Sequence, residues 1–223
     1  MRAQKPPRGV SLYSTWVNRP LGRRLAALAD VIRLTPDRVT VLSGLCSLTA
    51  MALLLVPRSV PVGPAVGGLL VLGFALDSAD GQLARLRRSG SRAGEFLDHM
   101  LDCLVKSGLH AAVLVAAYRA GEHGAVLLVP LAFQVVSVLL FFGGTLVAKL
   151  REQSERPDSQ RPGRRVTDGA SSVLLLPADH GVLCLTFLLW GIPELFGPAY
   201  ALLLLAHTAL LAVFALVWYR ELT

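Results

Sequence analysis

Long apolar stretches alternate with short polar connections along most of the chain. A helix needs about 20 apolar residues to cross the hydrocarbon core of a bilayer, so the shorter stretches would continue as helix at their polar ends. The pattern predicts an all-α integral membrane protein with six transmembrane helices. The six stretches are Val39–Val56, Val62–Leu76, Phe96–Tyr118, Ala125–Ala148, Gly181–Phe196 and Ala199–Tyr219.

Composition supports a membrane environment. Of the 223 residues, 53% are hydrophobic and only 17% are charged, whereas a soluble domain carries about 25% charged residues. The net charge of +7 does not indicate a nucleic-acid-binding protein, because the apolar stretches leave no compact soluble domain to bind a nucleic acid.

The basic residues are distributed unevenly among the connecting segments. Of the 22 Lys and Arg residues, eight precede the first stretch, four lie between the second and third, six lie between the fourth and fifth, and one follows the sixth. The segments on the other side hold only Arg58 and Arg119, and Lys106 lies within a stretch. The positive-inside rule therefore predicts that both termini face the cytoplasm. The basic face would attract anionic membrane lipids and phosphorylated substrates.

The chain before the first stretch has a different pattern. Apolar residues at three- and four-residue spacing predict an amphipathic helix that lies in the membrane interface; they are Leu21, Leu25, Leu28 and Ile32. Thr35 and Pro36 then form a helix-start signal, with Thr35 as the cap. We therefore expect residues 1–34 to form a cytoplasmic N-terminal segment with this helix, and residues 35–223 to form a six-span domain.

Four aspartates lie near the predicted cytoplasmic ends of the second and third spans. On a helix, Asp77 and Asp80 are separated by roughly 60° and Asp98 and Asp102 by roughly 40°, so each pair shares a face. Four ionised carboxylates at a low-dielectric boundary would repel one another unless cations neutralise them. Oxygen ligands that also accept phosphate favour Mg²⁺ or Mn²⁺.

Small residues and an arginine accompany these aspartates. Gly81, Ala84 and Gly94 leave space for a bulky ligand, such as a nucleotide, to approach the helix backbones. The Arg85 guanidinium, about one turn beyond Gly81, can hold phosphate oxygens in a bidentate fork. The pattern is typical of a metal-assisted phosphoryl-transfer site.

The segment from Asp77 to Asp102 reads DxxDGxxAR, eight residues, then GxxxDxxxD. In this it resembles the CDP-alcohol phosphotransferases (CDP-alcohol phosphatidyltransferases). The resemblance implies a six-span core, a homodimer and a cytoplasmic active site in a bacterial-type cytoplasmic (inner) membrane. One departure is Asp37, which stands where many members have asparagine and cannot donate a hydrogen bond.

The resemblance also implies roles for individual residues. Asp77, Asp80 and Asp98 would be metal ligands in a two-metal site with Mg²⁺ or Mn²⁺. Asp102 would be a further ligand or the general base, so Asp98 and Asp102 are the expected catalytic residues. The residues expected to border the CDP moiety are Gly81, Ala84, Arg85 and Gly94.

The implied reaction transfers a phosphatidyl or other substituted phosphate group from a CDP-linked lipid donor to a small polar alcohol, with release of CMP. CDP-diacylglycerol is the donor that the resemblance favours, and a CDP-inositol-type donor with a phosphorylated polyol acceptor is the alternative. Lys106, Arg164 and Arg165 are candidates for acceptor binding, although Lys106 could instead pair with the aspartates and the two arginines could serve topology alone. We expect His110 to be a packing residue and Asp179 to cap a helix.

Two other classes of protein also use membrane aspartates. An intramembrane prenyltransferase would need a second Asp-rich motif on a distant helix, and none is present in the sequence. A cation transporter would hold its carboxylates near the bilayer midplane, whereas these lie at the predicted boundary beside Arg85. A catalytically inactive homologue is disfavoured because all four aspartates are present.

Overall fold

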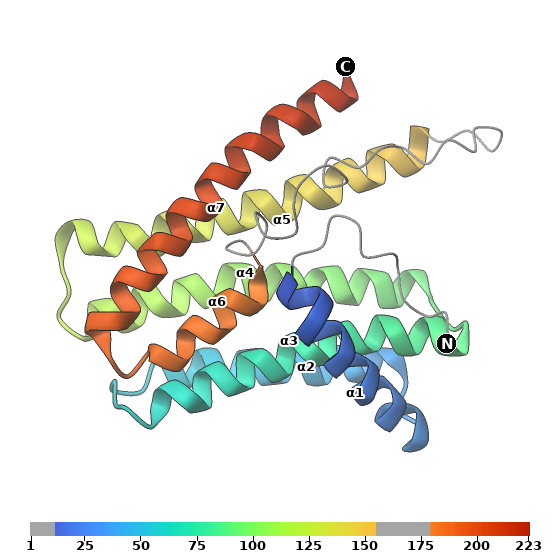
Figure 1. Ribbon diagram of the computed structural model, residues 1–223, viewed down its shortest axis with the longest axis horizontal. Coiled ribbons are helices and arrows are strands. Elements are labelled where there is room, and N and C mark those ends of the chain that lie inside the picture. Colours follow the sequence, from blue (N-terminus) through green and yellow to red (C-terminus); the bar gives the residue numbers. More distant parts are fainter. Residues whose placement is uncertain (1–11, 155–178) are drawn as a thin grey trace.

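The structure, a computed structural model, describes residues 12–154 and 179–223. These residues form helices and short connections, with no β-strand among them (Figure 1). The seven α-helices are α1 (Arg19–Val31), α2 (Pro36–Leu54), α3 (Val62–Arg87), α4 (Arg92–Arg119), α5 (Leu128–Ser154), α6 (His180–Thr186) and α7 (Pro193–Leu222). Three short helical turns accompany them: η1 (Ser14–Asn18), η2 (Gly124–Leu127) and η5 (Phe187–Leu189).

Five helical segments in the described residues are long and apolar enough to cross a membrane: α2, α3, α4, α5 with its preceding turn, and α7. For the residues that the structure describes, the expected all-helical fold with several candidate membrane spans is therefore confirmed. The expected span Gly181–Phe196 is represented by the shorter apolar helix His180–Leu189. The expected boundary between the fifth and sixth stretches, at Gly197 and Pro198, is wrong. Helix α7 already begins at Pro193 and contains Pro198 near its start.

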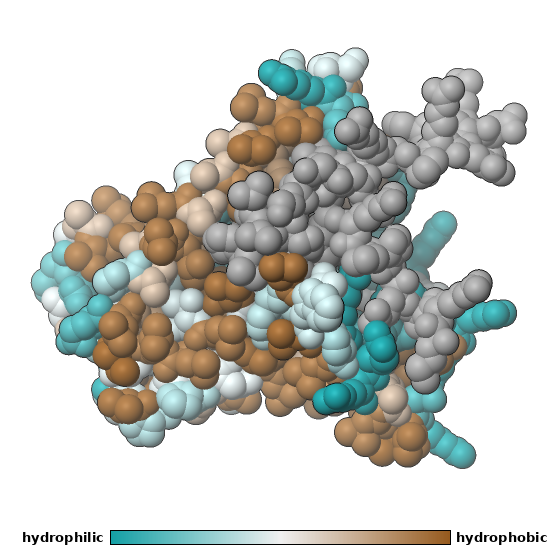
Figure 2. Space-filling view, viewed as in Figure 1, coloured by the Kyte–Doolittle hydropathy of each residue, from teal (hydrophilic) through white to brown (hydrophobic). Residues whose placement is uncertain are grey.

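The long helices connect alternately at two ends of the molecule. The α1–α2 and α3–α4 turns and the C-terminal ends of α5 and α7 lie at one end, on the right in Figure 1. Most described basic residues lie at that end, whereas Arg58 and Arg119 lie at the other. Figure 2 shows apolar surface over much of the middle of the molecule and polar surface toward both ends. This distribution is typical of a protein that crosses a bilayer.

A continuous apolar core joins α2, α3 and α4 to the later helices. Its largest fully buried side chains include Leu70, Leu109, Phe133, Phe187 and Trp190. Outside this core, many large apolar side chains on α5 and α7 are exposed, among them Leu139, Phe142, Leu205 and Leu216. Such outward-facing apolar surface suits contact with lipid.

Helix α1 packs across α3 through small residues. Gly22, Ala26 and Ala29 are buried against α3, and a Cβ atom on Gly22 would lie 2.8 Å from Ser78 Oγ. The large apolar residues Leu28, Val31 and Ile32 are instead exposed. The face of α1 that carries small residues therefore packs on α3, and the face that carries large apolar residues points away from the helical bundle.

The turn between α1 and α2 is fixed by side-chain hydrogen bonds. Arg87 at the end of α3 donates to Asp30 Oδ1 at 2.7 Å and to the backbone oxygen of Leu34 at 2.5 Å. The predicted cap is confirmed, since Thr35 Oγ1 accepts a hydrogen bond from the backbone N–H of Arg38 at 3.3 Å and Pro36 opens α2. These contacts hold the first turns of α2 beside the last turns of α3.

Candidate active site

A tight turn places the C-terminal end of α3 beside the N-terminal end of α4. Arg88 adopts a left-handed conformation with φ of 51°, and the next N–H, of Ser89, donates to the Ala84 carbonyl at 3.0 Å. Ser91 then caps α4, because its Oγ accepts a hydrogen bond from the Gly94 N–H at 2.9 Å. The turn thus brings the two halves of the aspartate motif onto adjacent antiparallel helices.

Three aspartates meet between these helices. Asp77, Asp80 and Asp98 each offer an oxygen atom, and the three oxygens lie within 4.8 Å of one another. Asp80 is buried, at 6% exposed. Asp77 and Asp98 are half-buried, so the cluster lies at the edge of the helical bundle and not in its centre.

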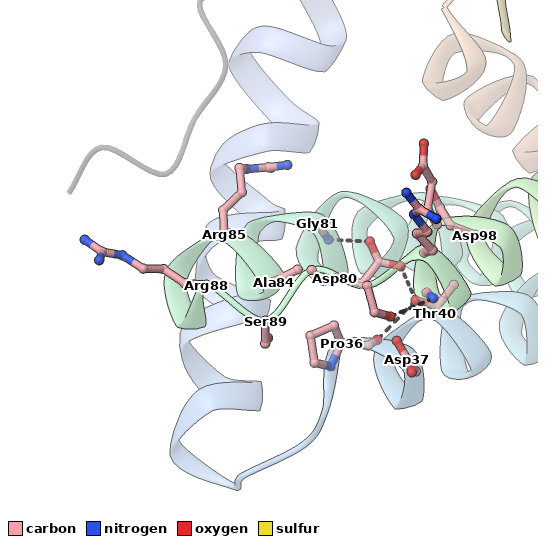
Figure 3. A pocket seen from close by; sticks show the side chains of 15 residues that line it. Pro36, Asp37, Thr40, Asp80, Gly81, Ala84, Arg85, Arg88, Ser89 and Asp98 are labelled. Atoms are coloured by element: carbon pink, nitrogen blue, oxygen red, sulfur yellow. Dashed lines mark hydrogen bonds between the residues drawn. The ribbon is translucent and has the colours of Figure 1, made fainter. Parts of the chain in front are cut away.

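Hydrogen bonds fix the orientation of the buried carboxylate. Thr40 of α2 donates from Oγ1 to Asp80 Oδ2 at 2.6 Å, and the Gly81 N–H donates to Oδ1 (Figure 3). Both oxygens of Asp80 therefore accept a hydrogen bond, and these bonds favour the charged carboxylate. This arrangement positions a ligand side chain before a cation binds.

The cluster suits a hard divalent cation. Its donors are carboxylate oxygens, the ligands that Mg²⁺ and Mn²⁺ prefer. Ligands of one octahedral Mg²⁺ are at most about 4.2 Å apart, and the ions of two-metal sites are about 3.5–4 Å apart. Oxygens within 4.8 Å of one another therefore fit two ions, or one ion after a small inward movement.

Asp102 lies one turn further along α4 and outside this three-oxygen cluster. Its Oδ1 accepts a hydrogen bond from Lys106 Nζ in an ion pair. Lys106 Nζ also lies 5.1 Å from the centre of the Phe141 ring of α5. Asp102 lines a small separate cavity together with Asp77 and His180.

A cavity of about 640 Å³ opens beside the carboxylates. It lies between the start of α2 and the α3–α4 hairpin, with Asp80, Asp98 and Thr40 along its wall (Figure 3). Every residue expected to border the CDP moiety lines this cavity, namely Gly81, Ala84, Arg85 and Gly94. Its volume is in the range of typical ligand pockets, about 300–1,000 Å³.

The two glycines keep the wall of this cavity open. A Cβ atom on Gly81 would lie 3.2 Å from Arg85 Nη1, so the guanidinium lies across the glycine. A Cβ atom on Gly94 would lie 2.9 Å from Asp37 Oδ1. Larger residues at either position would displace a polar side chain that lines the cavity.

Several lining residues were not among the expected site residues. Thr40 lies near the start of α2, and Arg88 and Arg92 were expected only to contribute to the basic face of the membrane protein. All three line the cavity. The signal for the arginines was their place in the loop between the two aspartate pairs.

Other polar residues have the structural roles expected for them. His110 is buried, with Nδ1 2.5 Å from the Tyr200 hydroxyl and its ring stacked on Phe133. Asp179 caps α6 by accepting a hydrogen bond from the Gly181 N–H at 2.7 Å. The remaining candidates, Arg164 and Arg165, lie outside the described residues.

The whole-chain comparison with protein families agrees with this geometry. Residues 33–219 match the family of CDP-alcohol phosphatidyltransferases. The chain belongs to this family. No curated protein matches the sequence at a significant level. Membership of the CDP-alcohol phosphatidyltransferases sets aside the prenyltransferase and cation-transporter interpretations.

The fold of this family member is similar to crystal structures of the phosphatidylinositol phosphate synthase of Mycobacterium tuberculosis. The structure with CDP-DAG bound has a TM-score of 0.57 and 21% identity over 91% of this chain and 94% of that chain. The complex with manganese and citrate gives 0.54 and 22% over 89% and 88%. The apo form gives 0.56 and 24% over 87% and 94%.

Proposed function

We propose that this protein transfers a phosphatidyl group from CDP-diacylglycerol to a hydroxyl group of a small polar alcohol and releases CMP. The observation that carries the proposal is the cluster of Asp77, Asp80 and Asp98 at the wall of a cavity of about 640 Å³. A carboxylate cluster beside a nucleotide-sized cavity is the arrangement that metal-assisted transfer of a phosphate group needs.

The donor proposal rests on the charge of the cavity and on the similar structures. Arg85, Arg88 and Arg92 line the cavity and supply cations for the pyrophosphate of a CDP-linked lipid. The similar synthase was solved with CDP-DAG bound and, separately, with manganese. Together these observations favour CDP-diacylglycerol over a soluble donor.

In the proposed reaction, Asp77, Asp80 and Asp98 would hold Mg²⁺ or Mn²⁺. The bound cations would supply charge that neutralises the phosphate oxygens and the negative charge on the leaving CMP. The acceptor oxygen forms a bond to the phosphorus atom of the phosphatidyl group as the bond from that phosphorus to CMP breaks. Asp102 accepts the hydroxyl proton as general base, and Lys106 holds the Asp102 carboxylate in position.

We also propose the membrane arrangement that the basic residues favour. The end that carries the aspartates faces the cytoplasm, with both termini, and helix His180–Leu189 belongs to a sixth crossing. Helix α1, in the segment 1–34 that precedes the domain 35–223, lies in the interface with its exposed leucine and isoleucine side chains in lipid. We further propose a homodimer and acceptor binding by Arg164 and Arg165, both supported by the resemblance to the family. Acceptor binding by Lys106 is supported by its position one turn beyond Asp102 on α4.

The test is CMP release by the purified protein with Mg²⁺ and labelled CDP-diacylglycerol against a panel of polar alcohols. We expect one alcohol to support turnover, and chelation of the metal to abolish it. Asp98→Asn should lower activity by at least about a hundredfold, because it removes a ligand from a centre worth several kcal/mol.

Glu194→Gln provides the matched control, since Glu194 is an exposed acid in the first turn of α7. Its activity should equal that of the native chain. A product formed only from CDP-inositol would replace the proposed donor. Full activity of Asp98→Asn, or full activity after chelation, would remove the metal-assisted mechanism.

A further inference from the structure

A further cavity, lined by two arginines, lies at the end of the molecule opposite the aspartates. Its volume is about 200 Å³, and it lies where α2 and α4 end. Apolar and small side chains form most of its wall, and the only charged residues that line it are Arg58 and Arg119. The lining residues are Leu54, Leu55, Val56, Pro57, Arg58, Ala116, Arg119 and Ala120.

The spacing along α4 places this cavity at the other membrane interface. Asp98 and Arg119 are joined by continuous helix, and 21 residues at 1.5 Å each separate them by about 32 Å. The hydrocarbon core of a bilayer is about 30 Å thick. The neighbouring Tyr118 is 62% exposed, as is typical of the aromatic side chains at membrane interfaces.

The structure holds the Arg58 cation without neutralising it. The guanidinium carbon lies 4.1 Å from the centre of the buried Trp190 ring. Arg58 Nε is buried and has no hydrogen-bond partner among the described residues. Glu122 attracts Arg58, but the described ion pairs within 4.0 Å include neither Arg58 nor Arg119. The cavity wall therefore carries positive charge that no described carboxylate pairs with directly.

Structural roles explain each arginine separately but not their common cavity. Arg119 lies in the last turn of α4, where a cation interacts favourably with the helix dipole, and Arg58 gains a cation–π contact. Neither effect requires a concave space between two cations. The positive-inside rule does not account for the two arginines either, because it favours basic residues at the opposite, cytoplasmic end. The other described basic residues lie at that end or, for Lys106, within α4.

We propose that Arg58 and Arg119 bind the phosphate group of an anionic phospholipid in the leaflet opposite the aspartate cluster. The guanidinium groups supply charge-assisted hydrogen bonds to the phosphate oxygens. The apolar wall and the exposed Leu55 and Val56 contact the glycerol and the first acyl carbons. The site is separate from the 640 Å³ cavity at the aspartates and does not depend on the proposed reaction.

Trp190 provides a local reporter for this site because Arg58 lies over its ring. The chain has three tryptophans, so Trp16→Phe and Trp218→Phe leave Trp190 as the sole tryptophan. The full chain in neutral detergent is titrated with dioctanoyl phosphatidylglycerol, dioctanoylglycerol or inorganic phosphate. We expect a saturable change in fluorescence with phosphatidylglycerol that exceeds the change with either other compound.

Arg119→Gln is the decisive variant, because Arg119 is exposed and its loss leaves the packing of Trp190 intact. It should weaken phosphatidylglycerol binding by at least about tenfold, since it removes charge-assisted hydrogen bonds. Arg119→Lys, which retains the charge, should keep most of the affinity. Arg24→Gln, which removes an exposed arginine of α1, should bind as the native chain does.

Three results would overturn the proposal. An equal response to dioctanoylglycerol would show that the cavity takes an acyl chain and not a phosphate group. An equal response to inorganic phosphate would remove the lipid and leave a soluble anion as the ligand. Unchanged binding by Arg119→Gln would show that the arginine pair does not form the site.

Discussion

Replacing Thr40 by valine removes the hydroxyl group that lies 2.6 Å from Asp80 Oδ2 and preserves the shape of the side chain. The same hydroxyl lies 3.1 Å from the Pro36 carbonyl oxygen. The shorter distance and the charged acceptor direct its hydrogen to the carboxylate. Thr40→Val therefore removes a hydrogen bond that holds a proposed metal ligand in place.

The magnitude follows from the charge and burial of Asp80. A hydrogen bond to a charged group contributes about 1.5–3 kcal/mol, which corresponds to about tenfold to a hundredfold in a binding constant. We expect the Mg²⁺ concentration at half-maximal CMP release to rise by that factor in Thr40→Val. Titration of the purified variant with Mg²⁺ at saturating donor and acceptor measures it.

The chain offers two controls on the same helix. Thr40→Ser keeps the hydroxyl and should retain a Mg²⁺ dependence close to that of the native chain. Thr49→Val removes an exposed hydroxyl that donates to the Leu45 carbonyl at 2.8 Å, far from the cluster, and should change nothing. The same Mg²⁺ dependence in Thr40→Val and Thr49→Val would contradict a role for the Thr40 hydroxyl in holding Asp80.

Two further predictions concern packing and the ion pair on α4. Gly22→Ala places a Cβ atom 2.8 Å from a side-chain oxygen of α3 and should lower the free energy of unfolding by about 1–3 kcal/mol. Gly68→Ala, with nothing within 4 Å of the added carbon, should leave that free energy unchanged. Thermal unfolding in detergent measures both variants, and equal stabilities would contradict close packing of Gly22 on α3. Lys106→Met removes the partner of Asp102 and should lower kcat by about tenfold or more. The Mg²⁺ concentration at half-maximal activity should stay the same. Steady-state kinetics that showed a change in this Mg²⁺ concentration and none in kcat would contradict the prediction.

Helical periodicity was sufficient to predict most of the aspartate cluster. It placed Asp77 and Asp80 on one face, and the structure brings both to Asp98. Periodicity gives the angle of a side chain about its helix but not its depth relative to a neighbouring helix. Asp102 lies about 6 Å further along α4 than Asp98, and at that depth it pairs with Lys106.

The contact from α2 could not be read from periodicity. Thr40 reaches Asp80 only because α2 packs closely on α3, where Ser43 Oγ donates to the Gly73 carbonyl at 2.8 Å. Such a contact depends on the register of two helices that are joined by a separate loop. The sequence indicates that a helix begins at Thr35 and Pro36, but it does not identify Asp80 as the partner of Thr40.

Hydropathy predicted the membrane spans better than it predicted the ends of the helices. The chain turns at Trp190–Ile192, and α7 begins at Pro193. The sequence Gly191-Ile192-Pro193 is typical of such a helix boundary. The Gly197-Pro198 pair looked similar but lies inside α7. Near the start of a helix, the missing N–H of a proline removes only one hydrogen bond, so the helix continues through it.

The clustered carboxylates and the hydroxyl group that orients one of them all come from α2, α3 and α4. During synthesis, a nascent chain that has reached the end of α4 already contains every one of these groups. The centre can thus assemble in the bilayer before the last spans leave the ribosome. The geometry of the clustered carboxylates therefore depends directly on the packing of α2, α3 and α4.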